Sequence, residues 1–540
     1  MLKFVILSIC CLLTEARPDH LSDRVMHPHP KKSFEKYNSN EENTADFWKT
    51  NAIKTLKQAV AAEHNTNVAK NVILFMGDGM SIPTLAATRV YMGGENFELS
   101  FEKFPYTAVS KTYCVNYQVA DSACTATAYL GGVKANLGTV GVTASVDWED
   151  CNAMTNTSNN VDSIAQWAQV KGKSTGFVTT ARVTHASPAG VFGHSAQRDW
   201  ETDTDIINDG KNASVCTDLA TQLVTEDVGK NLNVIMGGGR YAFLPKGTKG
   251  DEDDEGYRSD GVNLIEKWKE LKESEQAEYI WNREQLLALK PEETDYVLGL
   301  FESDHCPFHL ERDEALDPTL TEMTEAAINI LSKNSEGYFL FVEGARIDMG
   351  HHQAMAHLAL EETAEFSRAI ERAVNITSEN DTLIVVTADH AHTMSISGYP
   401  FRGNDILGTE GEAADDGLPF TTINYANGPG YQQPSKNGSR HNISEDDLSN
   451  IEYRFSAIFP LDSETHGGDD VLVFAKGPWA HLFRGVIEQN VIPHIMGYAS
   501  CLGDSNVTAC DDNNDVPVSA GTVFTSIYVF VVLALGCLFI

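Results

Sequence analysis

The segment Tyr338–His352, YFLFVEGARIDMGHH, decides how the chain folds. Its first five residues are apolar, aromatic or β-branched, which predicts a buried strand. Directly after this strand come Glu343, Asp348, His351 and His352. Asp348 and His352 are four residues apart, so a helix or a tight turn would place both side chains on one face. A carboxylate and an imidazole that converge on one point are typical ligands of a metal such as zinc. The alternative is a solvated turn with a surface ion pair.

Other continuous apolar runs repeat this pattern along the chain. Continuous rather than alternating apolarity predicts strands that are covered on both faces, as in a parallel sheet. Helical periodicity occurs between these runs, so we expect a three-layer α/β fold in which helices cover both faces of one large, mostly parallel sheet. The predicted strands are Asn71–Met76, Ser174–Thr180, Asn233–Met236, Tyr338–Val342, Leu383–Thr387 and Val471–Phe474. The predicted helices are Phe47–Ala62, Val161–Gln169, Ser214–Val224, Leu320–Ser332 and Gln353–Asn375.

The domain organisation follows from changes in composition. Residues 17–46 are polar and predict an N-terminal arm, whereas residues 47–510 carry the alternating strands and helices of one large domain. Within it, residues 396–462 contain Gly, Pro and Asn with little periodicity, and they lie between two apolar strands. We therefore expect this segment to be a small inserted surface subdomain.

Both ends of the chain carry predicted processing signals. Residues 1–16 combine Lys3, an apolar core and Ala16 as a cleavage edge, which is typical of a secretory signal peptide. Thr522–Ile540 is apolar and uncharged. A tail anchor is one interpretation, but no basic residue follows the apolar stretch. Small and polar residues in 511–521 precede it, which favours a glycosylphosphatidylinositol (GPI) attachment signal over 511–540 and a location on the outer face of the plasma membrane.

In a secreted protein, cysteine residues can form disulfides and asparagine residues in sequons can be glycosylated. Three of the ten cysteines lie in the predicted processed ends, which leaves seven. An oxidising compartment favours disulfides, and an odd number leaves at least one thiol free or paired between chains. Cys501 and Cys510 close a short loop and are an easy pair. Candidate glycosylation sites, each opening an N-x-S/T sequon, are Asn156, Asn212, Asn375, Asn437, Asn442 and Asn506.

The strong acidity of the chain excludes some partners. Its 540 residues carry a formal net charge of −36, and a nucleic acid would be repelled by such a surface. An anionic substrate would require metal ions and an arginine to reverse the sign of the charge locally. A soluble extracellular surface explains the acidity without any functional role.

Acidic and histidine residues gather next to the predicted strands. In open α/β sheets, functional groups collect at the carboxyl ends of the strands. A single acid at such a place is often only a cap or a turn former. Several sites with Asp, Glu and His together predict a metal centre instead. The residues concerned are Asp78, Glu343, Asp389, His390, His392 and His466.

Two further segments supply a candidate nucleophile and a candidate anion binder. In QVADSACTATA, residues 118–128, Ser122 opens a run of small residues that could begin a helix. A serine at a helix N-terminus meets the positive end of the dipole, which favours an alkoxide or a bound phosphate, although taken alone it is an ordinary cap. In residues 180–198 the polar candidates are His185, Ser187 and Arg198, and the arginine fork can hold two phosphate oxygens.

These motifs resemble those of the alkaline phosphatases, especially the animal membrane-anchored type. The matching stretches are NVILFMGDGM, DSACTATAYLGGVKAN, TTARVTHASPAGVFGHSAQRDW, VIMGGGR, FLFVEGARIDMGHH, LIVVTADHAH and ETHGGDDV. With the weaker similarity around them, the resemblance covers about residues 47–510. It implies a secreted, GPI-anchored homodimer that hydrolyses phosphate monoesters of broad type at alkaline pH, with a crown-like inserted subdomain.

The resemblance implies two zinc ions and one magnesium ion at matched positions. One zinc would be held by Asp348, His352 and His466, and the other by Asp78, Asp389 and His390. The magnesium would be held by Asp78, Ser187 and Glu343, with His185 close behind it.

The resemblance also implies the chemistry of the reaction. Ser122 matches the nucleophile that forms a phosphoserine, and Arg198 matches the arginine that holds the phosphate oxygens. Zinc next to the serine would lower the pKa of its hydroxyl group, and the second zinc would stabilise the leaving oxygen. Since little contact with the alcohol is needed, we expect broad specificity.

Further family features concern a calcium ion and the disulfides. Some members bind calcium, and the matched residues here are Glu252, Phe301, Glu302 and Asp317, with Glu252 chosen from an acidic loop. The family's paired cysteines match Cys151 with Cys216 and Cys501 with Cys510.

Three positions depart from the family pattern. Met349 stands where animal members commonly have His and some bacterial members Lys, which predicts weaker phosphate binding. Cys124 replaces a small residue two positions after Ser122, and Gly131 replaces a cysteine. The interpretations of Cys124 are an inert packed thiol or a redox-sensitive thiol.

Two alternative functions remain open on the same fold. One is a phosphodiesterase or sulfatase of the same superfamily, which typically lacks the third metal set, whereas Ser187 and Glu343 are both here. The other is a catalytically silent surface receptor, whose mark would be a missing nucleophile or ligand. None of the matched residues is missing.

Overall fold

The computed structural model describes residues 41–411, 413–436, 438–503 and 509–510. The predicted signal peptide, most of the N-terminal arm and the C-terminal region 511–540 lie outside these residues, as do the sequons at Asn437 and Asn506. No helix in the described part of the chain is both long and apolar enough to cross a membrane.

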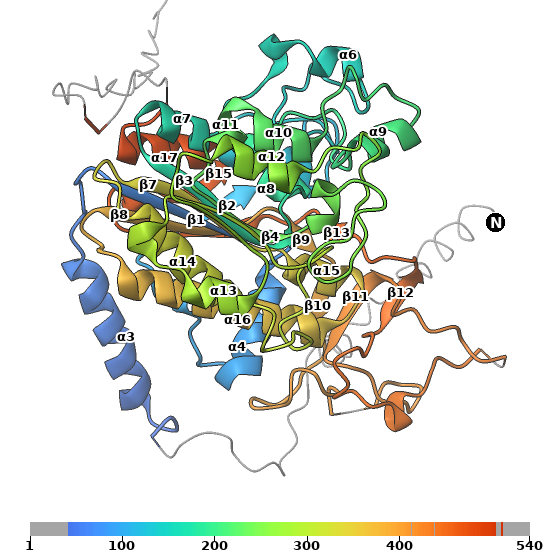
Figure 1. Cartoon of the computed structure of the whole chain (residues 1–540). Coiled ribbons are helices and arrows are strands. Elements are labelled where there is room, and N and C mark those ends of the chain that lie inside the picture. The colour runs from blue at the N-terminus through green and yellow to red at the C-terminus, as the bar shows by residue number, and fades with distance from the viewer. Residues whose placement is uncertain (1–40, 412, 437, 504–508, 511–540) are drawn as a thin grey trace, which may run out of the picture.

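Ten strands form one large sheet at the centre of the structure (Figure 1). They are β1 (Asn71–Gly77), β2 (Tyr106–Lys111), β3 (Ser174–Arg182), β4 (Val234–Gly238), β5 (Ala277–Ile280), β6 (Tyr296–Leu300), β7 (Tyr338–Gly344), β8 (Thr382–Ala388), β14 (Val471–Lys476) and β15 (Gly485–Glu488). Their order is β15-β2-β14-β8-β1-β7-β3-β4-β6-β5. From β8 to β5 all neighbours are parallel, and β14 runs antiparallel to both β8 and β2.

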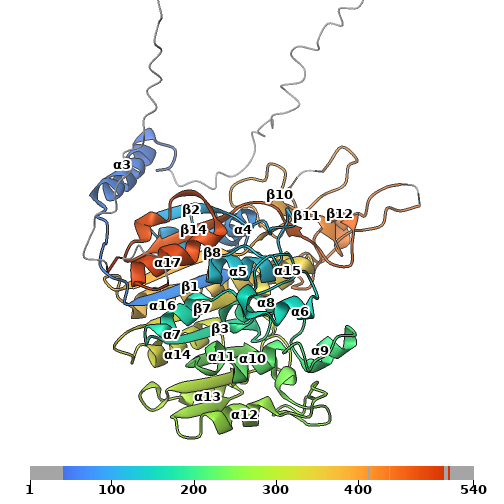
Figure 2. The same ribbon diagram turned by 90° about the horizontal axis from the view of Figure 1, so that it is seen from above.

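Helices cover both faces of this sheet, as the sequence predicts (Figures 1 and 2). Strand β1 shows why: Val72 and Leu74 enter one hydrophobic core, whereas Ile73 and Phe75 enter the other. The first core is completed by α5 (Ser122–Gly131), α7 (Ile164–Val170), α8 (Ala186–Phe192), α10 (Leu219–Thr225), α12 (Leu264–Leu271) and α17 (Ile492–Ser500). The second is completed by α4 (Ile82–Gly93), α13 (Arg283–Ala288), α14 (Leu320–Leu331) and α16 (Ala356–Ile376).

Shorter elements complete the architecture. These are α3 (Ala45–Ala61), α6 (Cys151–Met154), α9 (Asp203–Asn208), α11 (Asp227–Lys230), α15 (Arg346–His352), β9 (Ala391–His392) and β13 (His466–Gly467). Helix α3 buries none of its residues and begins before the expected boundary at residue 47, because Thr44 caps it by accepting a hydrogen bond from the Phe47 N–H at 3.3 Å.

Three predicted helices, α7, α10 and α16, begin later than expected, and α10 differs most. Helix α10 starts at Leu219 rather than at Ser214. The side chain of Asp218 accepts a hydrogen bond from the N–H of Thr221 at 2.9 Å, which fixes Asp218 as the N-cap. The five residues before Leu219 therefore stay outside the helix.

The expected inserted segment 396–462 forms a small sheet of its own at one side of the structure. It contains β11 (Ile423–Gly428) and β12 (Ala457–Pro460), and β11 also pairs with β10 (Met394–Ile396). Ile423 and Tyr425 of this sheet pack with Ala87 of α4 and Leu360 of α16 in one core. The segment is thus anchored to the helices on the second face of the large sheet.

Three disulfides join described cysteines. The Cys151–Cys216 and Cys501–Cys510 pairs confirm the expectation, and Cys306 is the buried free thiol that the odd count requires. Both interpretations of Cys124 as a free thiol are wrong, because Cys124 is bonded to Cys114. The two α-carbons lie 5.9 Å apart, which falls within the usual range for a disulfide.

Candidate active site and metal centre

The site lies at the carboxyl ends of three neighbouring parallel strands. Asp78 follows β1, Glu343 lies near the end of β7, and Asp389 with His390 follows β8. Because β7, β1 and β8 are adjacent and parallel, their carboxyl ends meet at one edge of the sheet. All four side chains are fully buried.

Helix α15 places Asp348 and His352 on one face, as their spacing predicts. The carboxylate of Asp348 lies 3.3 Å from Nε2 of His352. His466 comes from β13, which pairs with β9, and its Nε2 lies 3.4 Å from Asp348 and 3.1 Å from Nε2 of His352. The structure thus brings these three predicted ligands together from distant parts of the chain.

The hydrogen bonds of the two histidines fix their tautomers. Nδ1 of His352 lies 2.6 Å from the carbonyl oxygen of Glu464, and Nδ1 of His466 lies 2.7 Å from that of Ala120. Since a carbonyl oxygen can only accept, each Nδ1 donates, and a neutral ring then carries a lone pair on Nε2. Two such lone pairs facing Asp348 form a donor set that suits a zinc ion.

A second group of donors surrounds Ser122. Its Oγ, at the start of α5, lies 3.2 Å from Nε2 of His390 and 3.5 Å from Oδ2 of Asp78. Nε2 of His390 also lies 3.1 Å from Asp389. Asp389 is held by the N–H groups of Gly79 and His390, which donate to its Oδ1. Asp78, Asp389 and His390 offer ligand atoms close enough to hold one metal ion.

A third group shares Asp78 with the second. Asp78, His185 and Glu343 offer ligand atoms within 4.8 Å of one another. Several buried polar atoms of this group have no hydrogen-bond partner among the described residues, a state that is costly unless a cation or water satisfies them. These atoms are Asp78 Oδ1, His185 Nδ1, Ser187 Oγ and Glu343 Oε1.

The buried carboxylates repel one another. Burial, and then the charges of Asp389, Asp348 and Glu343, raise the pKa of Asp78 well above its ordinary value. Burial raises the pKa of Glu343 to about 8, even though Thr179 donates a hydrogen bond to it at 2.5 Å. Burial alone would raise the pKa of Asp348, but His352 and His392 hold it well below the usual range. Bound cations would relieve the remaining repulsion.

Arg198 reaches the site from the loop after α8. Its Nη1 donates to Oδ2 of Asp121 at 3.1 Å, and its Nη2 donates to Nε2 of His185 at 3.2 Å. Burial, and then the charge of Arg198, hold the pKa of His185 well below its ordinary value. His185 is therefore neutral and can accept from the guanidinium, which stays charged and is held by Asp121, the residue before Ser122.

The family model described as alkaline phosphatase matches residues 69–502. The chain belongs to the alkaline phosphatase family. It is 47% identical over 506 residues to the membrane-bound alkaline phosphatase of Bombyx mori. This match covers 91% of this chain and 90% of that protein. It is 48% identical over 478 residues to the tissue-nonspecific isozyme of Homo sapiens, covering 86% of this chain and 90% of that one.

Solved alkaline phosphatases share the fold. The enzyme of Thermus thermophilus superposes with a TM-score of 0.58 at 19% identity, covering 82% of this chain and 94% of that one. A cold-active alkaline phosphatase of Shewanella sp. superposes with a TM-score of 0.55 at 26% identity, and the match covers 80% of this chain and 100% of that one.

The sequence placed His392 among the candidate metal ligands, but it gave no role to Glu464 or Asp121 of this alkaline phosphatase site. Nε2 of His392 lies 2.6 Å from Oδ1 of Asp348, and its Nδ1 contacts Glu464. Burial lowers the pKa of His392, but the two carboxylates outweigh burial and raise this pKa to about 10. Asp121 holds Arg198. The only signals for Glu464 and Asp121 were their places close to His466 and Ser122 in the sequence. His351, by contrast, points away from the metal sets and contacts Thr84 and Tyr425.

The four residues matched to the calcium site of the family also lie near one another. Phe301 is buried directly after β6, and Glu302 follows it. Burial, and then the charges of Glu252 and Asp317, raise the pKa of Glu302 to about 7. Glu252 also forms an ion pair with Arg240. The carboxylates of Glu252 and Asp317, close enough to act on Glu302, give together with it an oxygen-rich donor set of the kind that calcium prefers.

Proposed function

We propose that this protein is a phosphoric monoester hydrolase that acts at alkaline pH through a phosphoserine on Ser122. One observation carries the proposal: a buried serine hydroxyl lies within 3.5 Å of both Asp78 and His390, next to an arginine held by Asp121. Metal dependence is a property of the family, and the Asp and His clusters fit it.

The donor sets support two zinc ions and one magnesium ion. The sets rich in histidine suit zinc, whereas the set with a hydroxyl and two carboxylates suits magnesium. Bound there, the ions would act as Lewis acids that lower the pKa of a nearby hydroxyl group and stabilise developing negative charge on oxygen. The first zinc set is Asp348, His352 and His466, the second is Asp78, Asp389 and His390, and the magnesium set is Asp78, Ser187 and Glu343.

The residues of the chain do the positioning. Ser122 stands at the N-terminus of α5, where the helix dipole stabilises an alkoxide and a phosphate group. In the proposed reaction its Oγ attacks phosphorus, the bond to the alcohol oxygen breaks, and the phosphoserine is then hydrolysed by water. Arg198 offers its planar fork to the non-bridging oxygens, and its two hydrogen bonds, to Asp121 and His185, fix the plane of the fork.

The calcium site is a separate proposal. Glu252, Glu302, Asp317 and the carbonyl oxygen of Phe301 would bind the ion, since oxygen ligands from carboxylates and the backbone are what calcium prefers. The observation that supports it is that burial, and then the charges of Glu252 and Asp317, raise the pKa of Glu302. Its expected effect is on stability, because none of these residues contacts Ser122 or Arg198 in the described structure.

We also propose an extracellular, GPI-anchored homodimer. The Bombyx mori relative is described as membrane-bound, which supports attachment to a membrane. Three disulfides suit an oxidising compartment. The described sequon residues are exposed, as glycosylation requires; they are Asn156, Asn212, Asn375 and Asn442. Release of the mature protein from cells by a phosphatidylinositol-specific phospholipase would test the anchor.

One assay tests the reaction itself. The purified protein should hydrolyse p-nitrophenyl phosphate at alkaline pH far faster than the bis-ester, and a chelator should abolish the activity. A preference for the bis-ester would favour a phosphodiesterase. Lack of turnover by a fully metallated, folded sample would favour a silent receptor.

A further inference from the structure

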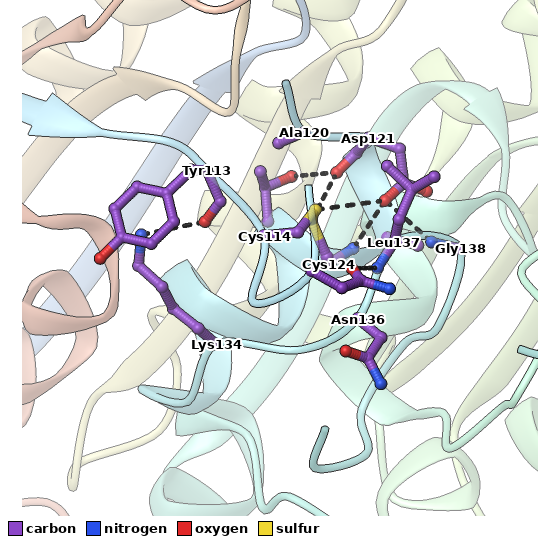
Figure 3. The surroundings of a disulfide bond; sticks show 12 residues. Tyr113, Cys114, Ala120, Asp121, Cys124, Lys134, Asn136, Leu137 and Gly138 are labelled. Atoms are coloured by element: carbon purple, nitrogen blue, oxygen red, sulfur yellow. Dashed lines mark hydrogen bonds between the residues drawn. A yellow bond between two sulfur atoms is a disulfide. The ribbon is translucent and has the colours of Figure 1, made fainter. Parts of the chain in front are cut away.

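The disulfide between Cys114 and Cys124 closes a loop that contains the proposed nucleophile, Ser122. Figure 3 shows the surroundings of this disulfide. Cys114 lies shortly after β2, and Cys124 lies in the first turn of α5, two residues after Ser122. Both cysteines are 2% exposed. The bond therefore ties the helix that carries the nucleophile to the end of a strand near the edge of the large sheet.

The first part of the loop inside this disulfide is held by few packing contacts. Residues 115–119 are all exposed, whereas the residues from Ala120 to Cys124 are buried. The Val115 N–H donates to the carbonyl oxygen of Ala135 at 3.0 Å, and Asn116 accepts from the Leu137 N–H at 2.9 Å. The end of the loop is fixed by the disulfide together with the small buried cluster that its cysteines form with Ala120 and Ala135.

The end of the loop touches two groups of the site. The carbonyl oxygen of Ala120 accepts from Nδ1 of His466 at 2.7 Å, and the carboxylate of Asp121 accepts from Arg198. Asp121 also accepts, at its Oδ1, the N–H groups of Cys124 at 3.3 Å and Gly138 at 3.0 Å. Figure 3 shows the carboxylate of Asp121 between the disulfide and Gly138. Asp121 is thus held by Cys124, at one end of the loop, and by Gly138, outside it.

We propose that the Cys114–Cys124 disulfide is a positioning element for Arg198 and the N-terminus of α5. It fixes Asp121 relative to Gly138, and Asp121 in turn fixes the plane of the guanidinium that faces the phosphate. The proposal rests on the function proposed above. Neither cysteine is one of the matched metal ligands, so the proposed effect of the disulfide passes through Asp121 and Ala120.

A disulfide with a purely structural role would behave differently. Such a bond stabilises mainly by restricting the unfolded chain, so its loss lowers the melting temperature and leaves the folded site unchanged. A positioning bond also changes the affinity for phosphate and the KM. These two constants do not depend on how much of the sample is folded, so they separate the two roles even if the variant is produced poorly.

The test compares two double variants. Cys114→Ala with Cys124→Ala removes the bond at the site, and Cys501→Ala with Cys510→Ala is the matched control. The two loops are of nearly equal length, with sequence separations of 10 and 9. We expect the first variant to bind inorganic phosphate, measured as a competitive inhibitor, roughly tenfold more weakly and to lose kcat/KM by about tenfold to a hundredfold, since small misplacements of positioning groups cost up to about a hundredfold. The control variant should have a lower melting temperature, with its affinity for phosphate and its KM unchanged.

Hydrogen exchange gives a second readout that does not need metal or substrate. The N–H groups of Cys124 and Gly138 donate to Asp121, so both should exchange faster in the variant that lacks the Cys114–Cys124 bond, in metal-free protein as well. Gly141, whose N–H donates to Thr127 within α5, is an internal reference that should change little.

Reduction of the wild-type enzyme covers the case in which the variant does not fold. A small dithiol transfers two electrons and two protons to the bond, which gives two cysteine thiols and the cyclic disulfide of the reagent. Molecules in which Cys114 and Cys124 are then alkylated should show the weaker phosphate inhibition. Unchanged KM and phosphate inhibition, in the variant or after reduction, would overturn the proposal. The function itself is tested separately, by the Ser122→Ala variant with the disulfide intact.

Discussion

Nε2 of His352 and Nε2 of His466 face each other at 3.1 Å. Each ring donates from Nδ1 to a backbone carbonyl oxygen, so in neutral rings neither Nε2 has a proton to share. Two lone pairs at this distance repel unless a cation or a shared proton lies between them and Asp348. The arrangement is therefore suited to a bound metal ion.

Metal removal is expected to cost both activity and stability. Without cations, Asp78, Asp389 and Glu343 remain buried together, and burial raises the pKa of each carboxyl group. At a free ion concentration about a thousand times Kd, binding stabilises the fold by about 4 kcal/mol per ion. Calorimetry with and without a chelator, together with elemental analysis, checks this. Equal melting temperatures for the loaded and stripped protein would contradict it.

Replacing Ser122 by alanine should remove turnover and leave the fold intact. The loss of a nucleophile in a constellation of this kind costs on the order of 10⁴ to 10⁶ in kcat. The measurement is steady-state hydrolysis together with a trap for the phosphoserine by rapid acid quench.

Ser163→Ala is a matched control for Ser122→Ala. Ser163 is another buried serine at a helix N-terminus, where it caps α7 and donates to the carbonyl oxygen of Val191. Its loss should cost about 1 kcal/mol of stability with little effect on kcat. Normal monoester hydrolysis by a folded, metallated Ser122→Ala protein would refute the proposed nucleophile.

Met349 is expected to set the affinity for phosphate. Its Sδ accepts a hydrogen bond from Arg346 at 2.9 Å, and its side chain packs beside Phe308. A thioether offers phosphate no donor, whereas a histidine does. Met349→His should therefore strengthen inhibition by inorganic phosphate several-fold and slow product release. Met349→Leu is the apolar control, and equal inhibition constants for the His and Leu variants would contradict the expectation.

Local patterns predict the centre of this structure well. The apolar run Tyr338–Val342 lies in β7, and Asp348 and His352 lie on one face of α15, as predicted. Both predictions succeed because each depends only on residues that are close in sequence. Four strands of the large sheet were missed: β2, β5, β6 and β15. Strands β2, β5 and β15 are partly exposed, so they lack the continuous apolar pattern that marks a buried strand, and β6 is buried but only five residues long.

Contacts between distant segments were harder to predict. His392 and Glu464 are far apart in sequence and meet where β9 pairs with β13. The sequence singled out Cys124 as unusual, yet nothing in its spacing selected Cys114 over the other cysteines as its partner. Resemblance supplied the other two disulfides because those pairs belong to the family pattern.

Calcium should stabilise the protein without changing its chemistry. Burial, then Glu252 and Asp317, raise the pKa of Glu302 to about 7, and a divalent cation would remove this repulsion. At about a hundred times Kd, calcium should add about 2.7 kcal/mol. In Glu302→Gln the increase in melting temperature should shrink or disappear. The exposed Glu292→Gln is the control, and an undiminished calcium response in Glu302→Gln would exclude this site.

Glu362 should make the folded chain less stable as the pH rises. Its side chain on α16 is 4% exposed, accepts a hydrogen bond from the His309 N–H, and has its pKa raised by burial to about 7 from 4.5. Between these values the folded chain keeps a proton that the unfolded chain has lost. The contribution of Glu362 to stability is therefore greatest below about pH 4.5 and is lost as the pH rises through 7, by about 3 kcal/mol in total.

Glu362→Gln should abolish this dependence, because glutamine stays neutral and its side-chain oxygen can still accept from His309. The variant should melt higher than the wild type at pH 8 and nearly equally at pH 5, and calorimetry across this range measures the difference. Glu365→Gln is the matched control on the same helix. Glu365 accepts from Thr321 and pairs with Arg368, so its replacement should destabilise the protein at pH 8. A Glu362→Gln variant that melts lower than the wild type at pH 8 would show that the carboxylate, rather than the carboxylic acid, is the form that the fold favours.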